Sequence, residues 1–192
     1  MICMKQLRTS VLMLFVFTVI TGIIYPALIT GIGEVFLSEK INGSLIVKSG
    51  SVIGSELIGQ KFEKPEYFHG RPSAVSYDAA GSGGSNYGPT NKKFIDQIKN
   101  RVIRIRKDFN LSENSSIPPD FVFASGSGLD PHISIESANL QAERIAAARK
   151  TAKSVITEII NSNGESQLCI YGSTYVNVLK LNSALDEKGG MK

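Results

Sequence analysis

Residues 10–32 read SVLMLFVFTVITGIIYPALITGI, an apolar run with no charged residue between Arg8 and Glu34. At a rise of about 1.5 Å per residue, a helix of this length crosses the roughly 30 Å hydrocarbon core of a bilayer. We therefore expect residues 10–32 to form one transmembrane helix, preceded by a short flank at residues 1–9. Residues 33–192 would then form a single soluble domain tethered to the membrane.

A secretory signal peptide is the alternative interpretation of this stretch. Signal peptides have an apolar core of about 7 to 15 residues, followed by a cleavage site built from small residues. The apolar core here is longer, and Ala27 has no second small residue two positions away to complete such a site. The sequence therefore favours an uncleaved anchor.

The charges that flank the helix predict its orientation. Lys5 and Arg8 precede the apolar run, whereas Glu34 and Glu39 follow it before the next basic residue, Lys40. Because basic residues mark the cytoplasmic side of a membrane helix, the N-terminus is expected in the cytoplasm. We thus predict a single-pass protein of the cell membrane with an extracytoplasmic C-terminal domain.

Small residues and a proline give the helix features that a lone anchor does not need. Small side chains let helices approach closely in lipid, and the proline removes a backbone donor and should kink the helix. The alternative is that glycine and proline are simply common in membrane helices. The residues concerned are Thr18, Thr21, Gly22, Pro26, Thr30 and Gly31.

The composition indicates one compact domain beyond the anchor. The net charge of +4 includes Lys5 and Arg8, so the domain is only mildly basic and no nucleic-acid partner is indicated. Cys3 and Cys169 would lie on opposite sides of the membrane and could not pair. We expect Cys169 to be a buried apolar side chain.

Periodicity predicts an α+β fold for this domain. Short β-like runs at residues 44–48 and 52–53 favour a hairpin. Apolar residues recur every three or four positions up to Phe109, which predicts an amphipathic helix that Thr90 or Asn91 can cap. Further helices are expected from Ser134, at 154–160 and at 175–186. In the first half of 175–186 apolar and polar residues also alternate, as in a strand. Further strands are expected at 121–124 and 167–171.

The amphipathic helix that ends at Phe109 has a strongly basic polar face. Such a face can meet anionic head groups or an acidic partner, or it can simply be solvated. The sequence leaves these interpretations open. The basic residues are Lys92, Lys93, Lys99, Arg101, Arg104 and Arg106.

Motifs that would carry catalysis or bind a metal are incomplete. In the glycine-rich run 81–86, Asn86 stands where the last glycine of a phosphate-binding loop would be. A nucleophile motif G-x-S-x-G fails because its first position is Ser125. His69 and His132 have no metal-ligand spacing. We therefore expect no catalytic and no metal-binding residues.

Residues 67–74 read YFHGRPSA and mix aromatic, ionisable and turn-forming residues. Two interpretations are open for this run. It forms a recognition loop, or Tyr67 and Phe68 anchor a turn that Gly70 and Pro72 shape.

A set of spaced blocks gives the chain a family resemblance. The blocks are TGIIYP at 21–26, NGSLI at 42–46, GSELIGQKF at 54–62, YFHGRPSA at 67–74, GGSN at 83–86, ASGSGLD at 124–130, QAERIAAAR at 141–149 and VNVLKLNSALD at 176–186. Together they resemble the C subunit of the Kdp-type potassium-transporting P-type ATPase. The match spans essentially the whole chain, which makes it more specific than any single glycine motif.

The resemblance implies an accessory membrane subunit. It would assemble with a channel-like potassium-translocating subunit and a P-type subunit that hydrolyses ATP, in a complex that takes up potassium with high affinity. In this family the C subunit is needed for assembly and is proposed to act as a catalytic chaperone that raises the ATP affinity of the hydrolysing subunit. The phosphorylated aspartate is not expected in this chain, which has no Asp-Lys-Thr-Gly.

The resemblance also suggests which residues meet partners. Gln141 and Arg144 are candidates for nucleotide contact. The predicted orientation, however, separates the domain from cytoplasmic ATP. It favours ATP binding elsewhere in the complex, with this chain acting on it indirectly. A membrane-anchored extracellular ligand-binding domain is the alternative function. The expected interface residues are Gly22 and Pro26 in the anchor, and Tyr67, Phe68, His69, Gly70, Arg71, Pro72, Ser73, Gly83, Gly84, Ser85 and Asn86 in the loops.

Overall fold

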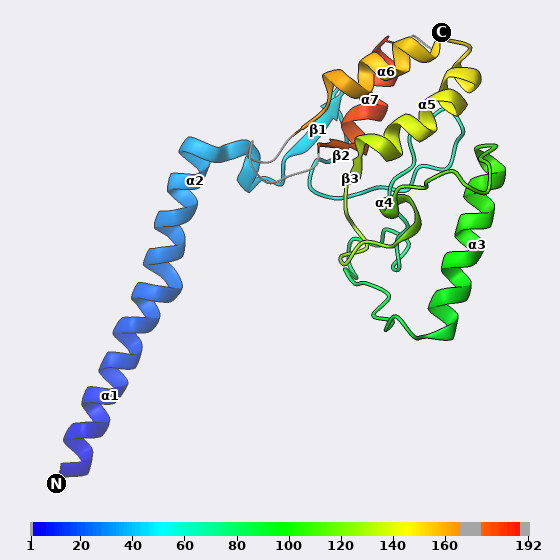
Figure 1. The fold of residues 1–192 in the computed structure, drawn as a ribbon. Helices are drawn as coiled ribbons and strands as arrows, with labels where there is room; N and C mark the ends of the chain where they lie inside the picture. The colour runs from blue at the N-terminus through cyan, green and yellow to red at the C-terminus, as the bar shows by residue number, and fades with distance from the viewer. Residues whose placement is uncertain (1, 166–173, 189–192) are drawn as a thin grey trace. The chain divides into compact units, whose positions relative to one another are not determined.

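The computed structural model describes residues 2–165 and 174–188. The chain divides into two units at residue 45, and the described residues of each are taken in turn. In the first unit, α1 (Ile2–Val19), η1 (Ile20–Ile24) and α2 (Tyr25–Ile41) follow one another as a single helical stretch (Figure 1). Within it, Met4–Ile41 is long and apolar enough to cross a membrane. The fold class is confirmed: one long apolar N-terminal helix precedes a domain of mixed helix and strand.

The helix is distorted just before Pro26. The backbone N–H of Tyr25 donates to the carbonyl of Ile20, so η1 has the wider π-helical spacing. A proline ring collides with the carbonyl four residues earlier, here that of Gly22, and a wider turn relieves such a collision. The distortion expected from Pro26 therefore takes the form of a π-helical turn.

A second irregularity lies near the end of α2. Leu37 leaves the helical region, with φ −139° and ψ 32°. The ribbon of α2 is accordingly bent (Figure 1). Ile41 then folds back over Gly33, where an added Cβ atom would lie 3.0 Å from Cγ2 of Ile41. Gly33 is consequently the one buried residue of α2.

The second unit contains two small sheets. Strands β1 (Leu45–Lys48) and β2 (Ser51–Ser55) pair with each other. Ser49 and Gly50 between them both have positive φ, as a type I′ hairpin turn requires, and the predicted hairpin is confirmed. Strands β3 (His132–Ser134) and β4 (Tyr175–Asn177) are antiparallel, with Ile133 opposite Val176.

Three helices supply most of the core. Helix α5 (Ile135–Arg149) begins at Ser134, whose hydroxyl accepts from the N–H of Ser137, and it packs on α6 (Lys153–Ser162). Helix α6 in turn packs on α7 (Val178–Lys188). Alanine side chains on α5 permit this close approach. The buried cluster contains Phe68, Ile133, Ala138, Ala142, Ile145, Ala146, Ile156, Ile159, Ile160, Val176, Val178, Leu181 and Leu185.

A smaller apolar cluster joins α3 (Lys92–Asp108) to α4 (Pro119–Val122). Helix α3 begins as predicted at Asn91, whose side chain accepts from the N–H of Phe94. Its buried residue Ile105 packs with Phe121 and Val122 of α4. Leu140 of α5 also packs against this smaller cluster, so α3 and α5 meet through it.

Two predicted elements were wrong, and one lies outside the described residues. Residues 121–124 are not a strand, because Pro119 occupies the first turn of a short helix, where its fixed φ is favourable. Residues 175–186 are not one helix, because the first three pair with β3 and the helix begins at Val178. The predicted strand 167–171 and Cys169 fall outside the described residues.

Candidate functional site

The predicted loop 67–74 starts within a segment, residues 65–69, that side chains of α5 and α7 hold in place and that we call the thread. Phe68 is fully buried, and its N–H donates to Oδ1 of Asn182 over 2.8 Å while Nδ2 of Asn182 donates to its carbonyl over 3.1 Å. The next residue, His69, is held in the same way by Gln141, at 2.8 Å and 3.0 Å. Two side-chain amides thus satisfy the backbone groups that a neighbouring strand would otherwise satisfy.

Two arginines of α5 also hold this thread. Arg144 donates to the carbonyl of Tyr67 over 3.0 Å and to Oε1 of Gln141 over 2.9 Å. Arg149 pairs with Asp186 at 2.8 Å, and its guanidinium lies 5.0 Å from the centroid of the Tyr67 ring. Tyr67 donates its hydroxyl to the same carboxylate over 3.2 Å. The start of the predicted loop is therefore fixed to both α5 and α7.

These contacts bear on the two candidates for nucleotide contact. Gln141 is fully buried, and both ends of its amide are engaged with His69. Arg144 is engaged with backbone carbonyls of the thread. A nucleotide would have to displace these bonds to reach either side chain, and their nucleotide role stays a prediction.

The loop 125–131 is the meeting point of the other predicted residues. Ser73 donates its hydroxyl to the carbonyl of Gly128 over 2.6 Å, and Gly83 donates its N–H to the carbonyl of Ser127 over 2.8 Å. Gly128 has a φ of +69°, and an added Cβ atom would lie 2.7 Å from the carbonyl oxygen of Gly83. The two sequence blocks expected at an interface are thus brought together through a third.

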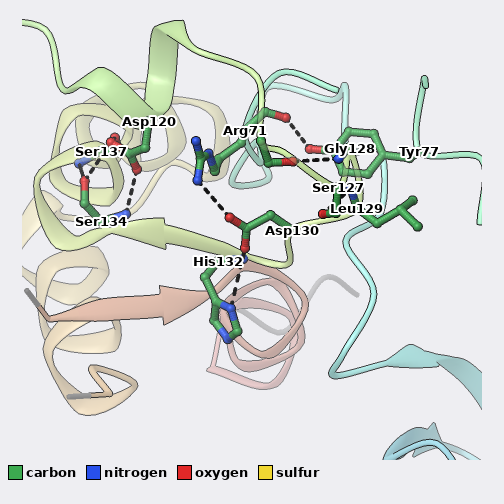
Figure 2. Close-up of polar contacts among 11 residues, drawn as sticks. Arg71, Tyr77, Asp120, Ser127, Gly128, Leu129, Asp130, His132, Ser134 and Ser137 are labelled. Atoms are coloured by element: carbon green, nitrogen blue, oxygen red, sulfur yellow. Dashed lines mark hydrogen bonds and ion pairs between the residues drawn. The ribbon is translucent and has the colours of Figure 1, made fainter. Parts of the chain in front are cut away.

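Asp130 links this loop to the thread. It lies between Arg71, whose Nη1 is 2.9 Å away, and His132, whose N–H donates to Oδ1 over 2.9 Å (Figure 2). Burial alone would raise the pKa of Asp130, but the hydrogen bonds from His132 and the Arg71 guanidinium outweigh it and lower that pKa. Asp130 is therefore held as a carboxylate.

Tyr77 completes the connection by donating its hydroxyl to the carbonyl of Arg71. Burial, assisted by the nearby charge of Asp130, raises the pKa of Tyr77 to about 12, so its hydroxyl keeps its proton. Sequence analysis identified Arg71 but missed its partner Asp130, which is 59 residues away.

A cavity of about 930 Å³ adjoins Arg71 and Asp130 and is lined by residues of β3, α4 and α5. At its edge Asp120 accepts from the N–H of Ser134 over 2.7 Å and from the hydroxyl of Ser137 over 2.7 Å, as Figure 2 shows. This carboxylate caps the start of α5, a favourable position for a negative charge. No sequence pattern singled out Asp120 in advance.

Two further predicted residues, Gly22 and Asn86, make no site contact of the kind described above within residues 2–165 and 174–188. Gly22 has no atom within 4 Å of an added Cβ, so its face of the anchor is free. Asn86 adopts a φ of +53°. Among the described residues, no group of three or more histidine, cysteine, aspartate or glutamate side chains could hold a metal ion.

The long apolar helix and the small mixed domain define a membrane-anchored α+β protein, whose predicted site residues mostly hold loops together. Comparison with known proteins gives the particular family. The chain belongs to the KdpC family, the c chain of the K+-transporting ATPase, whose sequence model matches residues 7–187. The family name identifies one subunit of a larger assembly, with potassium as the transported ion.

Individual relatives extend over nearly the whole chain. A protein of Mycobacterium bovis named potassium-transporting ATPase KdpC subunit is 47% identical over 185 residues, which cover 95% of this chain and 98% of the relative. A protein of the same name from Methylococcus capsulatus is 46% identical and covers 95% and 97%. One from Koribacter versatilis is 44% identical and covers 95% and 94%.

Proposed function

We propose that this chain is an accessory, non-catalytic subunit that assembles and stabilises a high-affinity, ATP-driven potassium uptake complex. Its partners are the channel-like subunit that translocates potassium and the P-type subunit that hydrolyses ATP. The observation that carries this proposal is the anchor itself: its apolar side chains are exposed along its length, and Gly22 and Gly31 have open faces. Small residues allow partner helices to approach such faces closely.

The proposed position of the domain is extracytoplasmic, over the entrance for potassium. The flanking charges support this orientation. The loops at residues 67–73 and 83–86 would contact the partner through their partly exposed residues, because Ser73 and Gly83 both bond to the loop 125–131. Phe68 is fully buried and would support this surface from within. A set of loops held in this way presents a defined surface rather than a changing one.

The proposed effect on ATP is indirect. A bound subunit shifts a conformational equilibrium only by contacting one state better than another. Acting as a catalytic chaperone, the chain would favour the pump state with higher ATP affinity. This route requires no nucleotide contact by Gln141, whose amide oxygen and nitrogen both bond to His69.

The test is purification of the tagged full-length chain from potassium-starved cells of its source in mild detergent. We expect recovery of a P-type ATPase and a channel-like protein, with potassium-stimulated ATP hydrolysis. Gly22→Leu should reduce this recovery and potassium uptake, whereas Ala27→Leu adds bulk elsewhere on the exposed helix and serves as the control. Recovery of a stable chain alone would instead favour the ligand-binding alternative, and unchanged assembly of Gly22→Leu would exclude packing through that glycine.

A further inference from the structure

A second cavity, of about 590 Å³, lies among α3, α5 and the segment 63–72. Its apolar lining includes Ile105, Phe109 and Phe121, which belong to the smaller core cluster. The basic side chains around it are arginines and one histidine. They are His69, Arg101, Arg104 and Arg144, together with the carboxylates of Glu63 and Asp108.

The positive charges in this cavity are incompletely balanced. Arg104 is 3.5 Å from Asp108, but no carboxylate of the described residues lies within 4.0 Å of the guanidinium of Arg101 or Arg144. Three arginines against two carboxylates leave a net charge of +1 around the cavity. A charge that is partly removed from water and unpaired is unfavourable, and an anion in the cavity would offset that cost.

The arginines also retain donors for a ligand. Arg101 uses Nη1 to donate to the carbonyl of Val122 over 3.0 Å, and Arg104 directs Nε toward Asp108. The Nε atom of Arg144 is buried without a hydrogen-bond partner. Guanidinium groups match tetrahedral oxyanions with paired N–H donors, which gives phosphate groups the best fit to such a set.

We propose that this cavity binds an oxyanion of the phosphate class, held by Arg101 and Arg104 of α3 and Arg144 of α5. The ligand is either a free phosphate or phosphomonoester or the phosphodiester of an anionic lipid head group. These sources share the same recognition chemistry. The site is separate from the cavity beside Asp130 and does not depend on the proposed function.

His69 provides the readout, because it lines the cavity and is one of only two histidines. Burial lowers the pKa of His69, and the charges of Arg144 and Arg104 lower it further, while Glu63 and a hydrogen bond with the Lys64 carbonyl oppose them. An added anion would stabilise the protonated imidazole, so it should raise the pKa of His69. His132 lies outside this cavity and serves as the internal reference.

The experiment uses the full-length chain with isotope-labelled histidines in zwitterionic phosphatidylcholine nanodiscs. Sodium phosphate is titrated against sodium chloride of equal ionic strength, and the histidine resonances are followed by NMR. We expect a saturable change at His69 with a raised pKa and no change at His132. Arg104 lines the cavity and its side chain is 83% exposed, so it can be replaced with little effect on the fold. Arg104→Gln should weaken binding several-fold, whereas Lys99→Gln on the same helix should not.

A second arm distinguishes the two sources of phosphate. If nanodiscs containing phosphatidylglycerol raise the His69 pKa without added phosphate, the ligand is a lipid head group. If only soluble phosphate does so, it is a free phosphate. The double variant Arg101→Gln/Arg104→Gln should bind at least tenfold more weakly to whichever of the two phosphate sources the cavity recognises. A His69 resonance that responds to neither probe, or responds equally in Arg104→Gln and Lys99→Gln, would overturn the proposal.

Discussion

Replacing Gln141 by leucine should destabilise the domain because, within residues 2–165 and 174–188, this amide bonds to both backbone groups of His69. The substitution removes bonds of 2.8 Å and 3.0 Å to that residue and one of 2.9 Å from Arg144. A buried backbone group left without a partner costs about 1–3 kcal/mol. Two such groups would cost roughly 2–6 kcal/mol if fully buried. The groups of His69 are part-buried, and the leucine offsets a further part through its apolar surface.

We therefore expect the free energy of unfolding to fall by about 3 kcal/mol. For a domain of this size, that corresponds to a decrease in Tm of about 6–12 °C. The measurement is thermal unfolding of the full-length chain in detergent, followed by near-ultraviolet circular dichroism of its tyrosines, because the chain has no tryptophan. Gln97→Leu, at an exposed position of α3, is the matched control.

The result that would refute this reasoning is a Gln141→Leu chain whose Tm equals that of the parent. If such a chain also lowered the ATP affinity of the assembled complex, the engaged amide would not be its main role, and nucleotide contact would become the better explanation. A loss of both stability and assembly would instead be the expected consequence of releasing the thread from α5.

Two further predictions concern the loop 125–131. Gly128→Ala should lower Tm by several degrees, because its φ is +69° and an added Cβ would lie 2.6 Å from Cγ2 of Val75, whereas Gly126→Ala meets no atom within 4 Å and should change little. Because the pKa of Asp130 is lowered on folding, its carboxylate stabilises the fold at pH values above its ordinary pKa of 3.8. This contribution is lost as the pH falls through the lower pKa of the folded state. Asp130→Asn should therefore be less stable at neutral pH and show a weaker acid dependence in pH-dependent unfolding, unlike Asp96→Asn; equal acid dependence in the parent and Asp130→Asn would contradict this assignment.

Local sequence patterns were sufficient for the anchor and for several elements of the domain. The apolar run fixes the membrane helix, and Asn91 and Ser134 cap helices where the sequence predicts them. Residues 121–124 were misassigned because a short apolar run suits a buried helix turn as well as a strand, and the preceding prolines favoured the helix. The pairing of β4 depends on β3, which is more than 40 residues away in the sequence.

The contacts that build the candidate sites could not be predicted in this way. Gln141 is 72 residues from His69, and the amide–backbone pairing leaves no periodic signal in either segment. The cavity near His69 likewise joins side chains of α3 and α5 whose spacing in the sequence is unrelated to their distance in space. Polar side chains on helices are usually solvated, so their burial had to come from the tertiary structure.

Arg144 connects the two parts of the domain that matter most for these proposals. Its Nη atoms hold the thread at Pro65 and Tyr67, while the same side chain lines the cavity proposed to bind an oxyanion. An anion beside Arg144 would favour the position that this side chain already occupies, and would thereby strengthen its hold on the thread. Because the thread continues into Arg71 and its pair with Asp130, occupancy of the cavity would also stabilise the neighbouring loop surface. Such coupling requires no movement of the core, since a ligand that binds one arrangement better increases the population of that arrangement.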